Sequence, residues 1–405
     1  MKKLLTILLL TTISFAWTHA DDSNDNDISS PIPYPPLKSK LEREGRLEDG
    51  AYIFQAEQIA LGRILESDAP AITGFFDITD KHLQHYPARR AKVSLTCPSG
   101  GVTAVPVNDD GSFSIEPSDR ASGRCVIRFH LDNNRFAYES PDGKSYAWEG
   151  PTVNLPLEHT VSIGIYRLNP QQANGQIGFI HLTYSQAMDF FTVNHIELDP
   201  WWRTTKIVWP AQADFYRPGA HKVHLTNAEA WDVNLHELGH AIVATFTNSS
   251  PAGGSHKIDE CYSQALAWSE GFPTFFAAAA RFSLLDEDPK FEYLVPRRAP
   301  IQIENVPSDV CTGETNEWRV AAALWDLADF HVDGNDRAVI SIAQMWAALL
   351  EGRISGFRSA WNLIERTLTP EETAKAKDAI KNNTIDYWAA PARVRTKAPA
   401  SVRWD

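Results

Sequence analysis

The stretch His236-Glu237-Leu238-Gly239-His240 decides the fold of the C-terminal part of the chain. It lies within residues 227–245, where the spacing of apolar side chains predicts a helix. Side chains four residues apart lie on one face of a helix, so the imidazoles of His236 and His240 can bind one metal ion. Glu237 is rotated by about 100° and can address a water molecule beside that metal. The pattern predicts a metal site with a carboxylate placed to act as a base.

Zinc is the metal that this pattern favours. A catalytic zinc takes three protein ligands and keeps a fourth position for water, so a third ligand must follow the motif. Two acids are candidates by position, because Glu260 lies twenty residues after His240 and Glu270 lies thirty residues after it. The motif could arise by chance, but two neighbouring buried histidines without a metal or polar partners would be costly.

The residues around the motif are similar to a known family. The run 232–241, DVNLHELGHA, together with SEGF at 269–272, resembles the gluzincin metallopeptidases, which include thermolysin and the aminopeptidases. Carried over by position, the resemblance implies that His236, His240 and Glu270 bind Zn²⁺ and that Glu237 is the general base.

Glu260 stays open as the alternative third ligand, because its interval from the motif is that of thermolysin. A metzincin is excluded, because Val243 and Phe246 stand where that class has glycine and histidine.

The resemblance implies hydrolysis of peptide bonds in a peptide or protein substrate. Such a reaction needs a donor that stabilises the tetrahedral oxyanion. Residues 316–320 open a predicted helix at the place in chain order where gluzincins often supply this donor, so Arg319 is the candidate catalytic residue. The alternative interpretation of Arg319 is a surface arginine that pairs with a nearby acid.

The first twenty residues predict export. Lys2 and Lys3 precede an apolar run at 4–16, and Ala20 follows as a small residue at a plausible cleavage point. No later apolar run approaches the length of about 20 residues that a membrane span needs. We therefore expect residues 1–20 to be a signal peptide and the protein to be secreted or periplasmic.

The charge of the chain argues against nucleic acid as a partner. The 405 residues contain 38 Lys and Arg against 51 Asp and Glu, which gives a formal net charge of −13. A phosphate backbone would be repelled by this excess of acids. The composition leaves the oligomeric state open.

We expect a multidomain chain with a β-sandwich followed by an α+β zincin-like domain. The leader at 21–70 is acidic and then rich in proline, which predicts a flexible segment. Residues 71–159 contain short alternating runs between turn signals, which predict the β-sandwich. This part resembles prealbumin-like modules found beside carboxypeptidase catalytic domains, through AKVSL at 91–95 and NDDGSFSI at 108–115.

Residues 160–405 are expected to form the zinc metallopeptidase domain, with a mostly helical C-terminal part. Strands are predicted at 176–184 and at 222–226, the latter as an edge strand. The predicted helices lie at 227–245, 258–282 and 318–330, with two more downstream. Capping signals at 226–229 and 369–372 predict two helix starts.

Four cysteines in an exported chain suggest two disulfides, although free thiols are the alternative. Of the three possible pairings, Cys97 with Cys125 and Cys261 with Cys311 are expected, because each pair lies within one apparent domain.

Two further functions stay open from the sequence. One is a secreted surface-binding or adhesion protein whose zinc site is vestigial or structural, and the other is a zinc hydrolase that acts on a non-peptide bond. Glu237 favours the peptidase over the adhesion protein, because a structural zinc site needs no general base.

Overall fold

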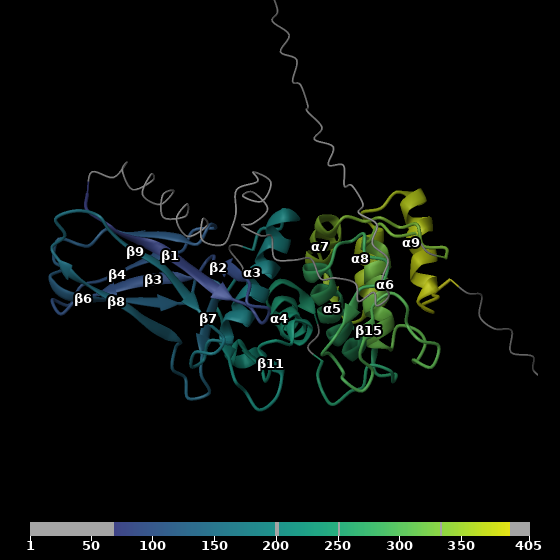
Figure 1. The fold of residues 1–405 in the computed structure, drawn as a ribbon. Coiled ribbons are helices and arrows are strands. Elements are labelled where there is room, and N and C mark those ends of the chain that lie inside the picture. Colours follow the sequence, from purple (N-terminus) through teal and green to yellow (C-terminus); the bar gives the residue numbers. More distant parts are fainter. Residues whose placement is uncertain (1–68, 199–201, 250–251, 333, 389–405) are drawn as a thin grey trace, which may run out of the picture.

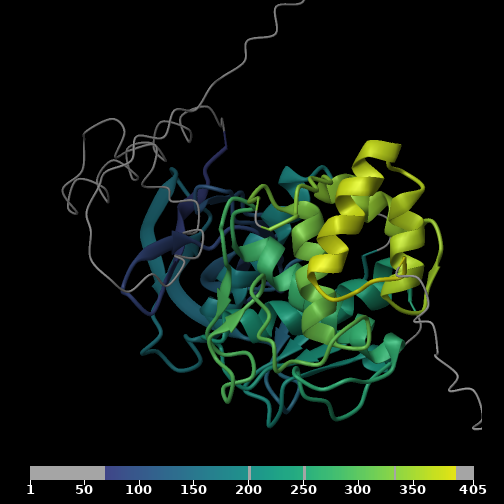
Figure 2. The same ribbon diagram turned by 90° about the vertical axis from the view of Figure 1, so that its right-hand side faces the viewer.

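Strands form most of the N-terminal part of the chain, and helices form most of the C-terminal part. The structure is a computed structural model that describes residues 69–198, 202–249, 252–332 and 334–388. Figure 1 shows the two parts side by side, with α3 and α4 next to the strands. In Figure 1 the yellow helix α9 lies at the end farthest from β1, β3 and β6, and Figure 2, turned by 90°, shows that end facing the viewer. The predicted signal peptide and nearly all of the predicted leader lie outside the described residues.

The N-terminal β-region, residues 69–168, consists of two four-stranded sheets. The first has β1 (Ile72–Thr79) between β2 (His85–Pro87) and β5 (Ser112–Ile115), with β9 (Val161–Leu168) also paired to β1. The second has the order β4 (Val102–Pro106), β3 (Lys92–Thr96), β6 (Gly123–His130), β8 (Ala147–Leu155).

Aromatic rings join the two sheets. Phe129 of the second sheet stacks on Tyr166 of the first with ring centroids 3.9 Å apart, and lies 5.0 Å from Phe76. The alternation predicted from the sequence is visible in β6, where buried side chains alternate with partly exposed ones.

One strand of the β-region belongs to a third sheet. β7 (Phe136–Glu139) pairs in parallel with β10 (Thr205–Val208), in the order β11-β12-β10-β7. β12 (Lys222–His224) confirms the strand predicted at 222–226, but it lies inside the sheet. One edge of this sheet is β11 (Phe215–Arg217), which pairs antiparallel with β12, and the other edge is β7.

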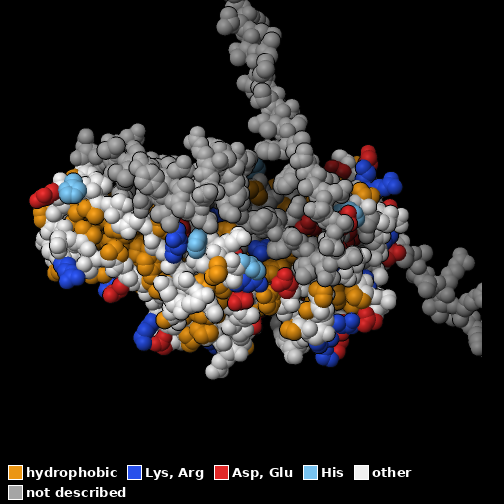
Figure 3. Space-filling view, viewed as in Figure 1, with side chains coloured by type: hydrophobic (Ala, Val, Ile, Leu, Met, Phe, Trp, Pro, Cys, Tyr) orange, Lys and Arg blue, Asp and Glu red, His pale blue; other side chains and the backbone are white. Residues whose placement is uncertain are grey.

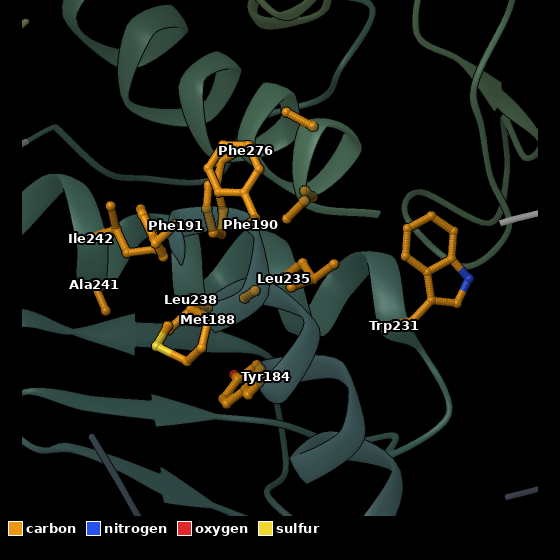
Figure 4. Packing of buried hydrophobic residues seen from close by; sticks show 14 of the residues in the cluster. Tyr184, Met188, Phe190, Phe191, Trp231, Leu235, Leu238, Ala241, Ile242 and Phe276 are labelled. Atoms are coloured by element: carbon orange, nitrogen blue, oxygen red, sulfur yellow. The ribbon is translucent and has the colours of Figure 1, made fainter. Parts of the chain in front are cut away.

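The prediction of a strand at 176–184 is wrong. These residues belong to the helix α3 (Ile177–Val193), which is buried on nearly all sides. A helix that is buried all round shows no 3.6-residue alternation of polar and apolar side chains, so its β-branched and aromatic start looked like a strand. Figure 4 shows Tyr184, Met188 and Phe191 of α3 close to Leu238 and Ile242 of α4.

Six helices of the described residues form the C-terminal part. They are α4 (Trp231–Phe246), α5 (Gln264–Arg281), α6 (Glu317–Ala328), α7 (Ile342–Leu350), α8 (Phe357–Glu365) and α9 (Pro370–Asn382). The capping box predicted at 369–372 is confirmed, since Thr369 and Glu372 satisfy each other's backbone groups. The start predicted at 226–229 is wrong, because α4 begins at Trp231 and Thr226 bonds Asp214 instead.

Two glycines allow α4, α5 and α6 to approach closely, and these helices are called the three-helix core below. A Cβ atom on Gly239 of α4 would lie 2.7 Å from the Cα of Pro273 in α5. A Cβ on Gly271 of α5 would lie 2.7 Å from the backbone oxygen of Glu317 in α6. Separations this short exclude any side chain larger than hydrogen unless a helix moves.

Both predicted disulfides are confirmed. Cys97 pairs with Cys125 and Cys261 pairs with Cys311. The first joins β6 to the segment after β3, and the second joins the approach to α5 to the segment before α6. Among the described residues, no helix is long and apolar enough to cross a membrane.

Candidate metal centre

Three side chains of the three-helix core converge on one point. The Nε2 atoms of His236 and His240 lie 3.3 and 3.2 Å from Oε2 of Glu270. One ligand atom from each residue lies within 4.8 Å of the others, and no other group of this kind occurs among the described residues. The two histidines come from successive turns of α4, and the glutamate comes from the facing turn of α5.

These separations fit a zinc ion. Zinc bonds of about 2.0–2.1 Å in a tetrahedron place ligand atoms about 3.3 Å apart, which matches both imidazole to carboxylate distances. Two imidazoles and one carboxylate are a donor set that catalytic zinc uses, with a fourth position for water.

The hydrogen bonds around His236 orient it for a metal. Its Nδ1 lies 3.0 Å from Oγ1 of Thr274, and the hydroxyl of Thr274 donates to the backbone oxygen of Glu270. The hydroxyl hydrogen is used in that bond, so Nδ1–H donates to Thr274 and the lone pair of Nε2 faces the site. Such an outer partner fixes the tautomer that binds metal.

Glu270 is held in its ionised form. Burial acts to raise the pKa of Glu270, but the imidazoles of His236 and His240 beside its carboxylate outweigh burial, and the pKa lies below its ordinary value. An ionised carboxylate is the form that binds a cation.

Glu237 lies beside the convergence point. It is buried, and among the described residues its Oε2 accepts no hydrogen bond. Burial raises the pKa of Glu237 to about 7. A buried carboxylate at a cavity wall with a raised pKa is the arrangement expected of a general base or acid.

A cavity of about 1120 Å³ opens in front of these side chains. Its walls come from β11 and its neighbours on one side and from the segments 252–256 and 293–296 on the other. Figure 3 shows that the lower edge of this face is hollowed between β11 and the loops near β15, and that acidic and basic side chains are interspersed over the face. The volume exceeds the range of about 300–1,000 Å³ typical of small-molecule pockets, so it has room for a polymer segment.

Asp232 forms hydrogen bonds to the backbone of one wall of the cavity. It is buried in the first turn of α4, and its Oδ2 accepts hydrogen bonds from the backbone N–H groups of Tyr293 and Leu294. Lys81 of the β-region donates to the hydroxyl of Tyr293 at 3.2 Å. Contacts from α4 and from the β-region therefore meet at this wall.

The alternative third ligand, Glu260, is not brought to the site. Its carboxylate is exposed and bonds Lys257 and the hydroxyl of Tyr262. Glu270 is the acid that lies against both motif histidines.

Arg319 is also placed away from the cavity. Its guanidinium donates to the backbone oxygen of Pro307, and it lies outside the cavity lining. Glu317, two residues earlier on α6, is the residue near the site. Two residues correspond to about 200° around a helix, so Glu317 and Arg319 face opposite sides. The predicted segment therefore reaches the site through a different residue.

His256 and Glu317 are neighbours of the site that the sequence interpretation missed. Nε2 of His256 lies 3.6 Å from Oε2 of Glu270 and 3.5 Å from Oε2 of Glu317. Burial lowers the pKa of His256, but the carboxylates of Glu317 and Glu270 outweigh burial and the pKa lies above its ordinary value. The sequence feature that could have identified His256 was its place in a glycine-containing loop between the motif and the third candidate ligand, Glu270.

Comparison with known proteins links the same part of the chain to peptidases. Residues 197–384 match the family described as "Mycolysin C-terminal domain". This match relates the part of the chain that carries the metal centre to a family of zinc metallopeptidases. No curated protein matches the chain.

Proposed function

We propose that the protein is a secreted or periplasmic zinc metallopeptidase of gluzincin type, with a zincin-like domain built on the three-helix core. His236, His240 and Glu270 are its zinc ligands, and Glu237 is its general base. The observation that carries this proposal is the convergence of the motif histidines with Glu270 at tetrahedral spacing on the wall of a large cavity. The match of residues 197–384 to a peptidase family supports it.

When bound, zinc would polarise the carbonyl of the scissile bond and lower the pKa of water at its open position. The carboxylate of Glu237 takes a proton from the attacking water and passes it to the leaving amine. Thr274 keeps His236 in the tautomer that leaves Nε2 free for the metal.

The residues that line the cavity favour a peptide as the substrate. β11 forms an edge of its sheet, and Phe215 and Tyr216 of this strand line the cavity. An edge strand offers unpaired backbone groups to an extended peptide, which gives affinity with limited demand on sequence. The rings of Phe215 and Tyr216 beside that edge suit apolar substrate side chains.

The test is hydrolysis of a mixed peptide library by the zinc-loaded protein and by Glu237→Gln. The variant removes the base and keeps the shape of the side chain, so activity should fall at least about 10²–10⁴-fold with one zinc per chain retained. Glu260→Gln is the matched control, because this exposed glutamate lies away from the site, and it should keep full activity. Undiminished hydrolysis by Glu237→Gln would refute the mechanism.

A further inference from the structure

A second, smaller cavity lies where the β-region meets the helices. Its walls come from the turn between β1 and β2, the N-terminal half of α3, the approach to α4, the last residue of α5, and Glu292. Its volume is about 230 Å³, which is below the range of about 300–1,000 Å³ typical of pockets for drug-sized ligands. None of the proposed zinc ligands lines it. This second cavity therefore offers space for one small molecule outside the candidate metal centre.

Arg281 brings a buried positive charge to the wall of the second cavity. It is 8% exposed, and its Nη1 donates to Oε1 of Gln186 at 2.7 Å. Its guanidinium carbon lies 5.1 Å from the centroid of the Trp231 ring, and Gln186 donates in turn to the backbone oxygen of Arg281. These contacts hold the guanidinium in one place. Because a guanidinium matches the shape of a carboxylate, the buried end of the cavity suits a carboxylate ligand.

Apolar side chains form the rest of the buried wall. Phe179 and Leu182 of α3 and Trp231 of α4 line the cavity and are buried. Trp231 meets Phe282 and Phe291 edge to face, which holds its indole in position. Figure 4 shows Trp231 at the start of α4, on the opposite side of the view from Ile242. An apolar group of a ligand gains free energy by leaving water for such a wall.

The solvent side of the second cavity is acidic. Glu229 is partly exposed, Glu292 is exposed, and both line the cavity. Asp80 lines it too, although its Oδ1 accepts hydrogen bonds from the backbone of its own turn. Against these acids the exposed side has the one lysine, Lys81. The excess of negative charge at this side attracts the ammonium group of a ligand.

The second cavity shares a wall with the large cavity of the candidate metal centre. Glu292 lines the second cavity, and the next residue, Tyr293, lines the large one. Lys81 lines the second cavity and donates to the hydroxyl of Tyr293 at 3.2 Å. A ligand in the second cavity therefore lies beside groups that border the proposed peptide site.

We propose that the second cavity is a binding site for a free amino acid with an apolar side chain, such as leucine. Its carboxylate pairs with Arg281, and its side chain contacts Leu182 and Trp231. Its ammonium group faces Glu229 and Glu292. The C-terminal residue of a peptide offers the same carboxylate and side chain but has an amide in place of the ammonium, so the acids favour the free amino acid. The inference does not depend on the proposed peptidase function.

The first test is calorimetric titration of the zinc-loaded full chain with L-leucine and two analogues. We expect L-leucine to bind with a Kd of about 1 mM or lower. N-acetyl-L-leucine, which has the amide of a peptide C-terminus, should bind about two- to fivefold more weakly. 3-Methylbutylamine, which lacks the carboxylate, should bind about 10–100-fold more weakly. Tighter binding of N-acetyl-L-leucine than of L-leucine would make the site one for peptide C-termini and refute the proposal.

The second test changes the two charged ends of the site separately. Arg281→Gln should lower the affinity for L-leucine and for N-acetyl-L-leucine alike, by about 10–100-fold. The double variant Glu229→Gln, Glu292→Gln should lower the affinity for L-leucine about two- to fivefold and leave that for N-acetyl-L-leucine unchanged. This second variant alters only groups that reach solvent, so it keeps the test decisive if Arg281→Gln does not fold. Arg120→Gln and Glu158→Gln, exposed residues of the β-region, are the matched controls and should bind both ligands normally.

The third test locates the bound amino acid by amide hydrogen exchange. L-leucine should slow exchange in residues 80–82, 228–231 and 292–293, and its affinity should be the same with and without zinc. Protection confined to the residues around His236 and His240, or binding that requires zinc, would place the ligand at the metal centre and overturn the inference. Absence of L-leucine binding to a folded, zinc-loaded chain would also refute it. A chain that binds L-leucine at the second cavity and cleaves no peptide would refute the proposed function alone.

Discussion

The acidic side chains of the third sheet and those of the three-helix core beside the candidate metal centre are paired with different types of residue. In the third sheet, Glu139 pairs with Lys206 and Lys222 from neighbouring strands. Where the β-region meets α3, Asp189 pairs with Arg89 and Arg90. In the three-helix core, the described ion pairs of Glu270 and Glu317 are with histidines alone.

This difference shows where the chain leaves room for a cation. Lys206 and Lys222 neutralise the charge of Glu139 at neutral pH, because a lysine stays protonated there. A neutral histidine leaves a lone pair and no charge, so in the proposed function a metal ion would complete the site formed by His236, His240 and Glu270. Glu139 is paired without any ligand, whereas the proposed metal ion would supply the cation beside Glu270.

The largest expected effect follows from removing that ligand. Zinc that binds the folded chain stabilises it by about 4 kcal/mol when free zinc is 1,000 times the dissociation constant. Chelation should therefore speed amide hydrogen exchange in α4 and α5 and leave β1, β3 and β6 protected. The measurement is exchange by mass spectrometry with and without zinc. Equal loss of protection in the helices and in the β-strands would contradict this prediction.

A smaller effect is expected in acid at the junction of the β-region and α3. His181 is fully buried, its Nε2 lies 2.9 Å from the backbone oxygen of Arg89, and its Nδ1 lies 3.2 Å from the hydroxyl of Tyr138. Burial, reinforced by the charges of Arg89 and Arg90, lowers its pKa from 6.5 to about 4 although the bond to Arg89 acts in the opposite direction.

Below pH 6.5 the unfolded chain therefore binds a proton at His181 that the folded chain does not bind. The free energy of unfolding falls as the pH drops from 6.5 towards 4. The loss is about 3 kcal/mol for this one group. Urea unfolding at pH 7 and pH 4 should show a pH-dependent loss that is smaller by this amount in His181→Gln, and unchanged in His159→Gln, which alters an exposed histidine of the β-region. An identical pH dependence in wild type and His181→Gln would contradict the assignment.

The smallest of these effects concerns the packing of α4 on α5. Gly239→Ala places a Cβ atom against the backbone of Pro273, which cannot move without its helix. We expect the free energy of unfolding to fall by about 1–3 kcal/mol and zinc affinity to fall with it. Gly219→Ala, where a new Cβ meets nothing within 4 Å, should change neither. A fully stable Gly239→Ala with normal zinc affinity would show that the glycine does not set the helix separation.

The sequence predicted those parts of the fold that have a local signature. Alternation identified the strands of the β-region, the motif identified α4, and the capping box located the start of α9. The strand predicted at 176–184 failed because α3 is buried on nearly all sides, and a helix without a polar face has no period to detect. β7 was missed as a member of the third sheet because its pairing with β10 joins residues far apart in the chain.

In the candidate site, too, the sequence predicted the residues that lie close together in the chain. His236, Glu237 and His240 share one helix, so spacing alone placed them together. The choice between Glu260 and Glu270 depends on how α5 packs against α4, which the close contact of Gly239 with Pro273 determines and spacing does not. His256 and Glu317 meet only because Asn316 and the Cys261–Cys311 disulfide fasten two distant segments.

The zinc content of purified wild type, Glu270→Ala and Glu260→Ala, determined by mass spectrometry after dialysis, shows directly whether Glu270 completes the metal centre. We predict one zinc per chain in wild type and in Glu260→Ala, because the carboxylate of Glu260 bonds Lys257 and Tyr262 away from the histidines. Glu270→Ala should lose zinc, since it removes one of three ligands. Normal zinc in Glu270→Ala together with loss of zinc in Glu260→Ala would contradict the proposed metal centre.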